Sequence, residues 1–194
     1  MTRHQMPGII RETSEGTSRL CIQDEMLERR EIDCVGEIDA DMMYSLALQM
    51  RYLQGTDPEG QITLYINSLG GSVTDGLAIY DTMQSVSCPI RTVCTGMAAS
   101  MAAVLFAAGD VREMLPHARI MLHDPLAKGI SGSALHVDSA SRNLMEMREV
   151  LAGILARHTG HDIEDVYRST VEDTYFSARE AVGFGLADRI IGSL

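Results

Sequence analysis

The chain has 194 residues, 45% of them hydrophobic, which fits a single folded domain and excludes a disordered chain. A formal net charge of −11 excludes the basic face that binding a nucleic-acid backbone requires. The four cysteines lack metal-site spacing, so we expect reduced thiols and neither a metal nor another cofactor. No apolar run has the length of a signal peptide or membrane span, which predicts a cytoplasmic location, with an organelle as the alternative, and no membrane contact.

The N-terminal half of the chain alternates between helix-like and strand-like segments. Residues 1–18 are polar and irregular, which predicts a flexible N-terminal segment. Apolar residues at helical spacing predict a helix over 39–54. The apolar, β-rich run QITLYIN at 61–67 predicts a buried strand, and a second helix over 72–85 follows a pair of glycines.

The same alternation continues toward the C-terminus. A strand-like run at 90–94 is followed by a glycine break and by a helix predicted over 98–108, which is rich in small residues. Residues 120–122 predict a further strand, and the capping box SARE at 177–180 opens a short helix. Strand, break and helix in succession predict an α/β fold, and no linker divides residues 19–194 into two domains.

One predicted helix is unusually long, because its pattern begins after the polar stretch 129–133 and ends near His158. About 25 helical residues span nearly 40 Å, more than a domain of this size needs internally. The helix at about 133–158 is therefore expected to project and to pack on another subunit. Gly160 is the predicted stop, and one apolar stripe runs along the helix through Leu144, Met147, Leu151 and Ile154.

Two strand-to-helix junctions have features of a reactive site, NSLGG at 67–71 and GMAASM at 96–101. A glycine pair lets the backbone turn sharply and leaves N–H groups free to donate, although most such glycines only make turns. In the second junction Ser100 is expected in the first turn of a helix, where unpaired N–H donors suit a developing oxyanion. A serine among alanines is also typical of helix packing, so both interpretations remain open.

His123 and Asp173 are weaker candidates when each is taken alone. His123 follows the apolar strand 120–122, and active-site groups of α/β folds emerge at such strand ends. A turn histidine fits the same pattern. Asp173 is one of many acidic residues, and its aromatic neighbours and the capped helix after it indicate only an ordered loop.

The order of these motifs resembles the Clp protease proteolytic subunit over nearly the whole chain. LYINSLGG at 64–71 is similar to the family's strand and oxyanion turn, and GMAASMAA at 96–103 to its nucleophile motif. MLHDP at 121–125 and DTYFSA at 173–178 look like its histidine and acid segments. The resemblance implies the α/β fold of the ClpP and crotonase superfamily, with repeated ββα units and a projecting helix.

The resemblance also implies a serine endopeptidase with the catalytic triad Ser100, His123 and Asp173. Ser100 would be the nucleophile and His123 the general base, which then acts as general acid. Asp173 would orient the imidazole and stabilise its protonated form. The backbone N–H groups of Gly71 and Met101 would hold the oxyanion.

Substrate binding and assembly are likewise implied by the resemblance. The peptide would bind as an added strand along Ser72, Val73 and Leu126, which gives broad specificity because main-chain pairing reads no side chain. Family members stack two heptameric rings into a chamber, so we expect a homo-oligomer joined through the long helix. An ATP-driven unfoldase such as ClpX, ClpA or ClpC would supply unfolded polypeptides. This chain has no phosphate-binding loop, so only the unfoldase would use ATP.

Three positions differ from the usual family pattern. Leu69 stands where many relatives have proline, and Glu172 stands where many have an arginine that pairs the rings. Ser85 replaces an aromatic residue of the unfoldase-docking pocket, whereas Tyr65 is retained. These differences favour, as an alternative, a regulatory paralogous subunit of mixed rings. A crotonase-like acyl-CoA enzyme is a third hypothesis, which leaves Ser100 and His123 unexplained.

Overall fold

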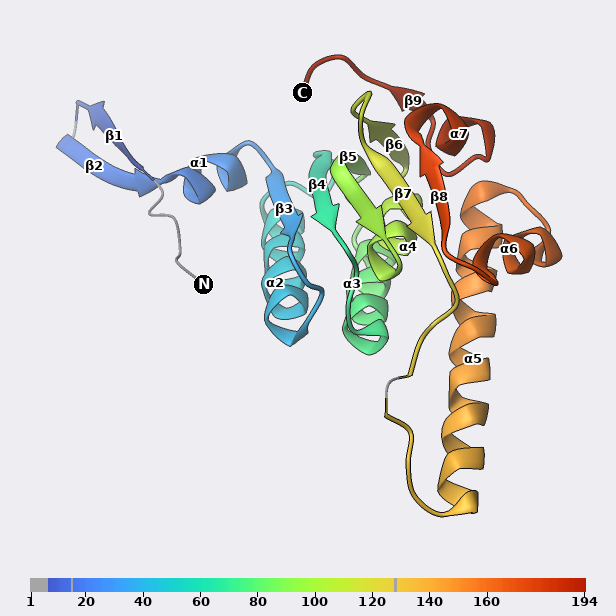
Figure 1. Ribbon diagram of the computed structural model, residues 1–194. Helices are drawn as coiled ribbons and strands as arrows, with labels where there is room; N and C mark the ends of the chain where they lie inside the picture. Colours follow the sequence, from blue (N-terminus) through green and yellow to red (C-terminus); the bar gives the residue numbers. More distant parts are fainter. Residues whose placement is uncertain (1–6, 15, 128) are drawn as a thin grey trace.

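The structure, a computed structural model, describes residues 7–14, 16–127 and 129–194, and its centre is a seven-stranded, mostly parallel sheet (Figure 1). The parallel strands, in order across the sheet, are β3 (Glu31–Val35), β4 (Ile62–Ser68), β5 (Ile90–Ala99), β6 (Val111–Met114) and β9 (Arg189–Ile190). Off this path, β7 (Arg119–Leu122) pairs in parallel with β5, and β8 (Thr174–Ser177) pairs antiparallel with β7. The predicted α/β fold is confirmed.

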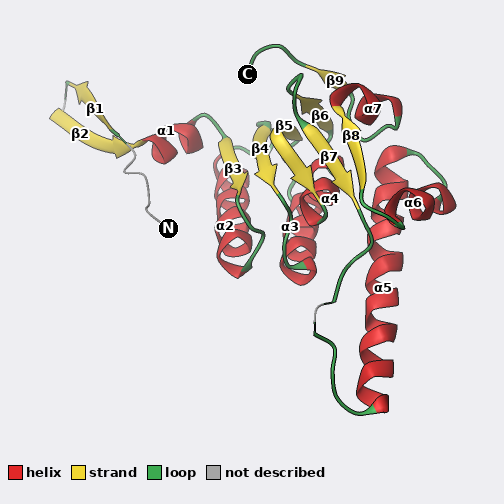
Figure 2. Ribbon diagram, in the orientation of Figure 1, coloured by secondary structure: helices red, strands yellow, loops and turns green. Residues whose placement is uncertain are grey.

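Helices α2 (Ala40–Thr56), α3 (Val73–Ser85) and α4 (Met101–Ala107) follow β3, β4 and β5 in the chain and lie on the same side of the sheet (Figure 2). All seven residues of α4 are buried. Its alanines let the helix lie close to the sheet, while Leu105 and Phe106 fill the core, each contributing about 1.5–3 kcal/mol through burial. This central helix therefore fixes the position of whatever precedes it in the chain.

The predicted long helix is present as α5 (Ala134–Thr159), which extends away from the body of the molecule (Figure 1). The Ser133 side chain caps its start by accepting a hydrogen bond from the His136 N–H, and Gly160 ends it in the left-handed conformation. Its buried residues, Ala152, Ile154 and Leu155, all lie near its C-terminal end. Within the described chain, no helix combines the length and the apolar character needed to cross a membrane.

The expectation of irregular structure over residues 1–18 is wrong for the part that the structure describes. β1 (Gly8–Thr13) and β2 (Gly16–Cys21) form an antiparallel pair, which leads into α1 (Ile22–Glu28). These strands are stabilised by hydrogen bonds between their backbones, and few of their side chains are buried. Their sequence therefore lacks the alternation of apolar and polar residues that predicts a strand. Residues 1–6 and 15 lie outside the described residues, and the flexibility of the segment stays a prediction.

The predicted helix over 98–108 is wrong at its start. Residues 97–99 belong to β5, because they pair in register with residues 119–121 of β7. The helix α4 begins only at Met101, which leaves Ser100 in the turn between strand and helix. Alanine favours helices, but pairing with a strand twenty residues away outweighs that local preference.

The C-terminal segment is held by a buried carboxylate. Only 2% of the Glu113 side chain is exposed, and it accepts hydrogen bonds from Arg91 Nε at 2.7 Å and Arg189 Nε at 2.6 Å. Burial alone would raise the pKa of Glu113, but the two guanidinium groups outweigh it and hold the pKa below its ordinary value. This cluster joins β5, β6 and β9 across the sheet.

We expect Glu113→Gln to lower the free energy of unfolding by about 1–3 kcal/mol, because both guanidinium groups lose their carboxylate. The lowered pKa means that the charged form stabilises the fold above the ordinary glutamate pKa of about 4.3. That stabilisation is lost as the pH falls through the lower, folded-state value. Denaturant titrations at pH 7 and pH 3 test this, with the exposed Glu59→Gln as control, and an equal difference at both pH values would contradict it.

Candidate active site

The register of three adjacent strands brings together residues from distant parts of the sequence. Ala99 at the end of β5 lies opposite Met121 of β7, and Leu122 lies opposite Thr174 of β8. Because β5 and β7 are parallel, the next residue after β5 and the next after β7 emerge at the same edge of the sheet. Because β8 is antiparallel to β7, the residue that precedes β8 reaches that edge as well.

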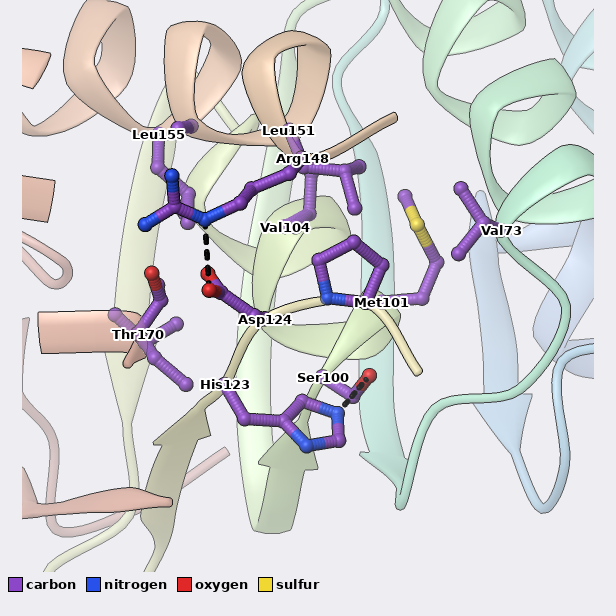
Figure 3. Close-up of a pocket in the computed structure, with 13 residues that line it drawn as sticks. Val73, Ser100, Met101, Val104, His123, Asp124, Arg148, Leu151, Leu155 and Thr170 are labelled. Atoms are coloured by element: carbon purple, nitrogen blue, oxygen red, sulfur yellow. Dashed lines mark hydrogen bonds and ion pairs between the residues drawn. The ribbon is translucent and has the colours of Figure 1, made fainter. Parts of the chain in front are cut away.

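These three positions are Ser100, His123 and Asp173, and the structure brings their side chains together. His123 Nε2 lies 2.7 Å from Ser100 Oγ, a hydrogen bond drawn in Figure 3. On the other side of the ring, His123 Nδ1 lies 3.4 Å from Asp173 Oδ1. Only 17% of the His123 side chain is exposed, against 60% of that of Asp173. The contact between serine and histidine is thus close and sheltered, whereas the acidic partner is more distant and open to water.

The backbone at Ser100 has a rare conformation. Its φ of 54° and ψ of −124° lie outside the regions favoured for a residue with a side chain, and such strain costs about 1–3 kcal/mol. The Ser100 N–H donates to the Met121 carbonyl at 2.9 Å, and the Ser100 carbonyl accepts from Ala103 N–H at 2.9 Å. These bonds hold the turn against its strain and direct the hydroxyl out of the sheet toward His123.

The glycine turn after β4 lies against this serine. A Cβ added at Gly70 would come within 2.8 Å of Ser100 Cβ and 3.1 Å of Met101 N. Gly71 forms a bridge with Ile38 that uses the Gly70 carbonyl and the Ser72 N–H, so the Gly71 N–H points to the opposite side. Met101 is the first residue of α4, and its N–H has no acceptor within the helix. The glycine turn and the start of α4 thus each leave one N–H near Ser100 without an acceptor among the described residues, and the role of these two groups as the oxyanion hole stays a prediction.

Two polar residues that the sequence analysis did not single out shape these turns. Asn67 Oδ1 accepts a hydrogen bond from Met97 N–H at 3.1 Å, and the buried Ser68 Oγ accepts one from Gly70 N–H at 3.1 Å. The pairing of β4 with β5 is irregular at this point. Two polar side chains at the end of a buried strand, shortly before two glycines, are the signal in the sequence that could have identified them.

A comparison with protein families matches the Clp protease family over residues 14–193. The chain belongs to the Clp protease family. The resemblance in the sequence motifs is thereby confirmed, and the protein is a peptidase of the Clp type. The matched region contains every residue of the site described above.

The predicted substrate-binding residues of this Clp protease lie around the same site. The main-chain groups of Ser72 are already used, since its N–H donates to the Ile38 carbonyl and its own carbonyl accepts from Gly76. Val73 begins α3, and Leu126 is 70% exposed in the loop after β7. These two main-chain groups of Ser72 are therefore not available to pair with an added peptide strand. Substrate binding by these three residues stays a prediction.

A small cavity opens beside the serine of this Clp protease (Figure 3). Its volume is about 20 Å³, enough for one water molecule. Ser100 and His123 stand at one end, and the polar side chains of Asp124 and Arg148 at another. The rest of the lining is mostly apolar and includes Val73, Met101, Val104, Leu122, Leu151 and Leu155.

Two of the buried thiols, those of Cys34 and Cys94, do not offer an alternative nucleophile. Burial raises the pKa of Cys34 to about 12 and the pKa of Cys94 to about 11. Both groups therefore stay protonated near neutral pH, and a protonated thiol is a poor nucleophile. Within the described residues, no cluster of three or more acidic, histidine or cysteine side chains has the arrangement of a metal site.

We expect Gly70→Ala to reduce reaction of Ser100 with a fluorophosphonate probe at least 100-fold, because its Cβ would displace the serine and the Met101 N–H. Gly160→Ala is the matched control. Gly160 also has a positive φ, 77° against 92° for Gly70, but an added Cβ there meets no described atom within 4 Å. Equal losses of labelling in the two variants would show that backbone strain, and not contact with Ser100, causes the effect.

Proposed function

We propose that this protein is the proteolytic subunit of an ATP-dependent Clp protease, a serine endopeptidase that cleaves unfolded polypeptides into short peptides. The observation that carries the proposal is the 2.7 Å hydrogen bond between His123 Nε2 and Ser100 Oγ at a strained turn. A hydroxyl held on an imidazole in this way is the arrangement that activates a serine nucleophile.

In the first half of the reaction, Ser100 Oγ attacks the carbonyl carbon of the scissile peptide bond. His123 Nε2 takes the hydroxyl proton as the new C–O bond forms, and Asp173 stabilises the imidazolium through Nδ1–H. The negative charge that develops on the carbonyl oxygen is held by the N–H groups of Gly71 and Met101. The imidazolium then donates its proton to the leaving amine, the C–N bond breaks, and an acyl-enzyme remains.

In the second half, water replaces the departed amine. His123 removes a proton from the water, whose oxygen attacks the acyl carbon while the same two N–H groups hold the oxyanion. Collapse of this intermediate breaks the bond to Ser100 Oγ, and His123 returns the proton to it. The products are a peptide with a new carboxylate and the free enzyme.

The surroundings of Ser100 support an extended peptide as substrate. The apolar cavity beside the serine favours a small apolar side chain next to the scissile bond, because such a side chain buries surface without stranding a polar group. The glycine turn also lines an open groove of about 510 Å³, which leaves its main chain accessible. Pairing of the peptide main chain with this turn and with the Leu126 segment explains why many sequences would be cleaved.

Assembly belongs to the proposal as well, in the form of two stacked heptameric rings that meet through α5 in the cytoplasm. Exposed apolar side chains on α5, including Leu135 and Met145, are consistent with a helix that packs on a partner subunit. Tyr65 lines an open groove of about 420 Å³ with Val35 and Leu194, which suits docking of an unfoldase such as ClpX, ClpA or ClpC. ATP would be consumed by that partner and not by this chain.

A regulatory subunit is the second candidate, and one observation favours it. Asp173 is 60% exposed and 3.4 Å from the imidazole, so the acidic member is incompletely held in the single chain. Glu172, beside it, replaces the arginine by which many relatives pair their rings. Such a chain would form an inert homo-oligomer and become active only in mixed rings with a paralogue.

We expect Ser100→Ala to abolish fluorophosphonate labelling and to lower turnover of short fluorogenic peptides roughly 10⁴- to 10⁶-fold, because the nucleophile is lost. Ser45→Ala on the exposed face of α2 is the control and should leave both unchanged. Retained cleavage by the Ser100 variant would sink the assignment of the nucleophile.

We expect the activity of the purified chain to rise steeply with protein concentration, in parallel with the mass of the intact particle, because assembly is needed to hold Asp173. Native mass spectrometry and peptide cleavage on the same samples test this. An assembled particle that stays inert until a paralogous subunit is added would support the regulatory role instead. Full activity in a monomer would contradict both forms of the proposal.

A further inference from the structure

The loop that carries His123 is tied to the long helix by an ion pair. Asp124, the next residue, accepts a hydrogen bond from Arg148 Nε of α5 at 2.7 Å. Figure 3 shows Arg148 reaching from the helix to the Asp124 carboxylate, at the end of the cavity away from the Ser100 hydroxyl. Only 24% of the Arg148 side chain and 30% of the Asp124 side chain are exposed, so water weakens this pair less than a surface pair.

Both members of the pair are also held by α6 (Ile163–Thr170). The guanidinium carbon of Arg148 lies 4.0 Å from the centre of the Tyr167 ring, a cation–π contact that fixes the plane of the guanidinium. The Asp124 N–H donates to the Thr170 carbonyl at 2.7 Å. Asp124 is thus fixed through its side chain by α5 and through its main chain by the end of α6.

Little else holds the loop on the side facing away from Ser100. The contact of His123 with Asp173 is 3.4 Å long and open to water. The chain after Asp124 has no regular secondary structure over residues 125–127 and 129–133, so it does not anchor the imidazole. The position of His123 relative to Ser100 therefore depends strongly on Asp124.

We propose that Arg148 and Asp124 are positioning residues for the peptidase reaction, which hold His123 on Ser100 by tying its loop to α5 and α6. The inference rests on the proposed function and adds a regulatory element to it. A displacement of about 1 Å at a catalytic group lowers the rate about 100-fold, so breaking this ion pair would lower kcat. Since Arg148 lies on α5, movement of that helix upon assembly is transmitted to His123.

The experiment compares Arg148→Gln, Asp124→Asn and the double variant with the wild type, all as the assembled particle. We expect each single variant to lower kcat about 10- to 100-fold with KM changed less than threefold, because the substrate contacts stay in place. The double variant should lose no more than either single variant, because the two residues act as one unit. Arg148→Lys should recover part of the loss, since lysine keeps the charge but not the planar contact with Tyr167.

Arg142→Gln is the matched control, since Arg142 lies on the same helix and forms an exposed ion pair with Asp138. It should leave both kcat and KM unchanged.

Particle mass and thermal midpoint, measured on every variant, separate positioning from assembly or folding. Single variants with wild-type kcat would overturn the inference while leaving the proposed function intact. Additive losses in the double variant, or no recovery of kcat in Arg148→Lys, would also overturn it. A wild type that neither cleaves peptides nor reacts with the probe would overturn the proposed function and this inference together.

Discussion

β5 changes its neighbour part-way along its length, and the geometry of the site depends on that change. Residues 91–94 pair with β6, whereas residues 97–99 pair with β7. Asn67 stabilises the point at which the neighbour changes, because its Oδ1 accepts a hydrogen bond from the Met97 N–H. The same oxygen would lie only 2.7 Å from a Cβ added at Gly96, so a side chain at that position would not fit beside it. If β5 paired with β6 throughout, β7 would not lie beside Ala99 and His123 would not reach Ser100. The irregular pairing is thus a requirement of the site and not a defect of the sheet.

Local signals were enough to predict most of the fold. The helix expected over 39–54 is α2 (Ala40–Thr56), and the one expected over about 133–158 is α5 (Ala134–Thr159), because spacing and end signals act within a few residues. The start of α4 was missed, since Ala98 favours a helix until β7 is available as a partner. The hairpin of β1 and β2 was missed for a related reason, because backbone pairing leaves no mark on exposed side chains.

For the candidate site, the sequence motifs predicted three residues that the structure brings together, but not the geometry in which they lie. Motif order led to Ser100, His123 and Asp173, but no pattern in the sequence indicated a positive φ at Ser100 or the long, exposed contact of Asp173. Those features arise from contacts between segments far apart in the chain. Arg148 was missed for the same reason, since a helix residue twenty-four positions from Asp124 shows its role only when α5 lies against the histidine loop.

The members of the proposed triad are held by different parts of the molecule, and this determines how the proposed reaction would be controlled. The strand register and the core helix α4 fix Ser100, so the position of this proposed nucleophile is kept as long as the domain is folded. Asp173 precedes β8, which pairs only with β7, and its carboxylate is exposed. His123 lies between the partly buried Ser100 turn and the exposed Asp173, and its loop is connected through Arg148 to the projecting helix α5. In the proposed assembly, contacts that cover α5 would therefore act on the histidine loop while leaving Ser100 in place, so assembly would regulate proton transfer and not the position of the proposed nucleophile.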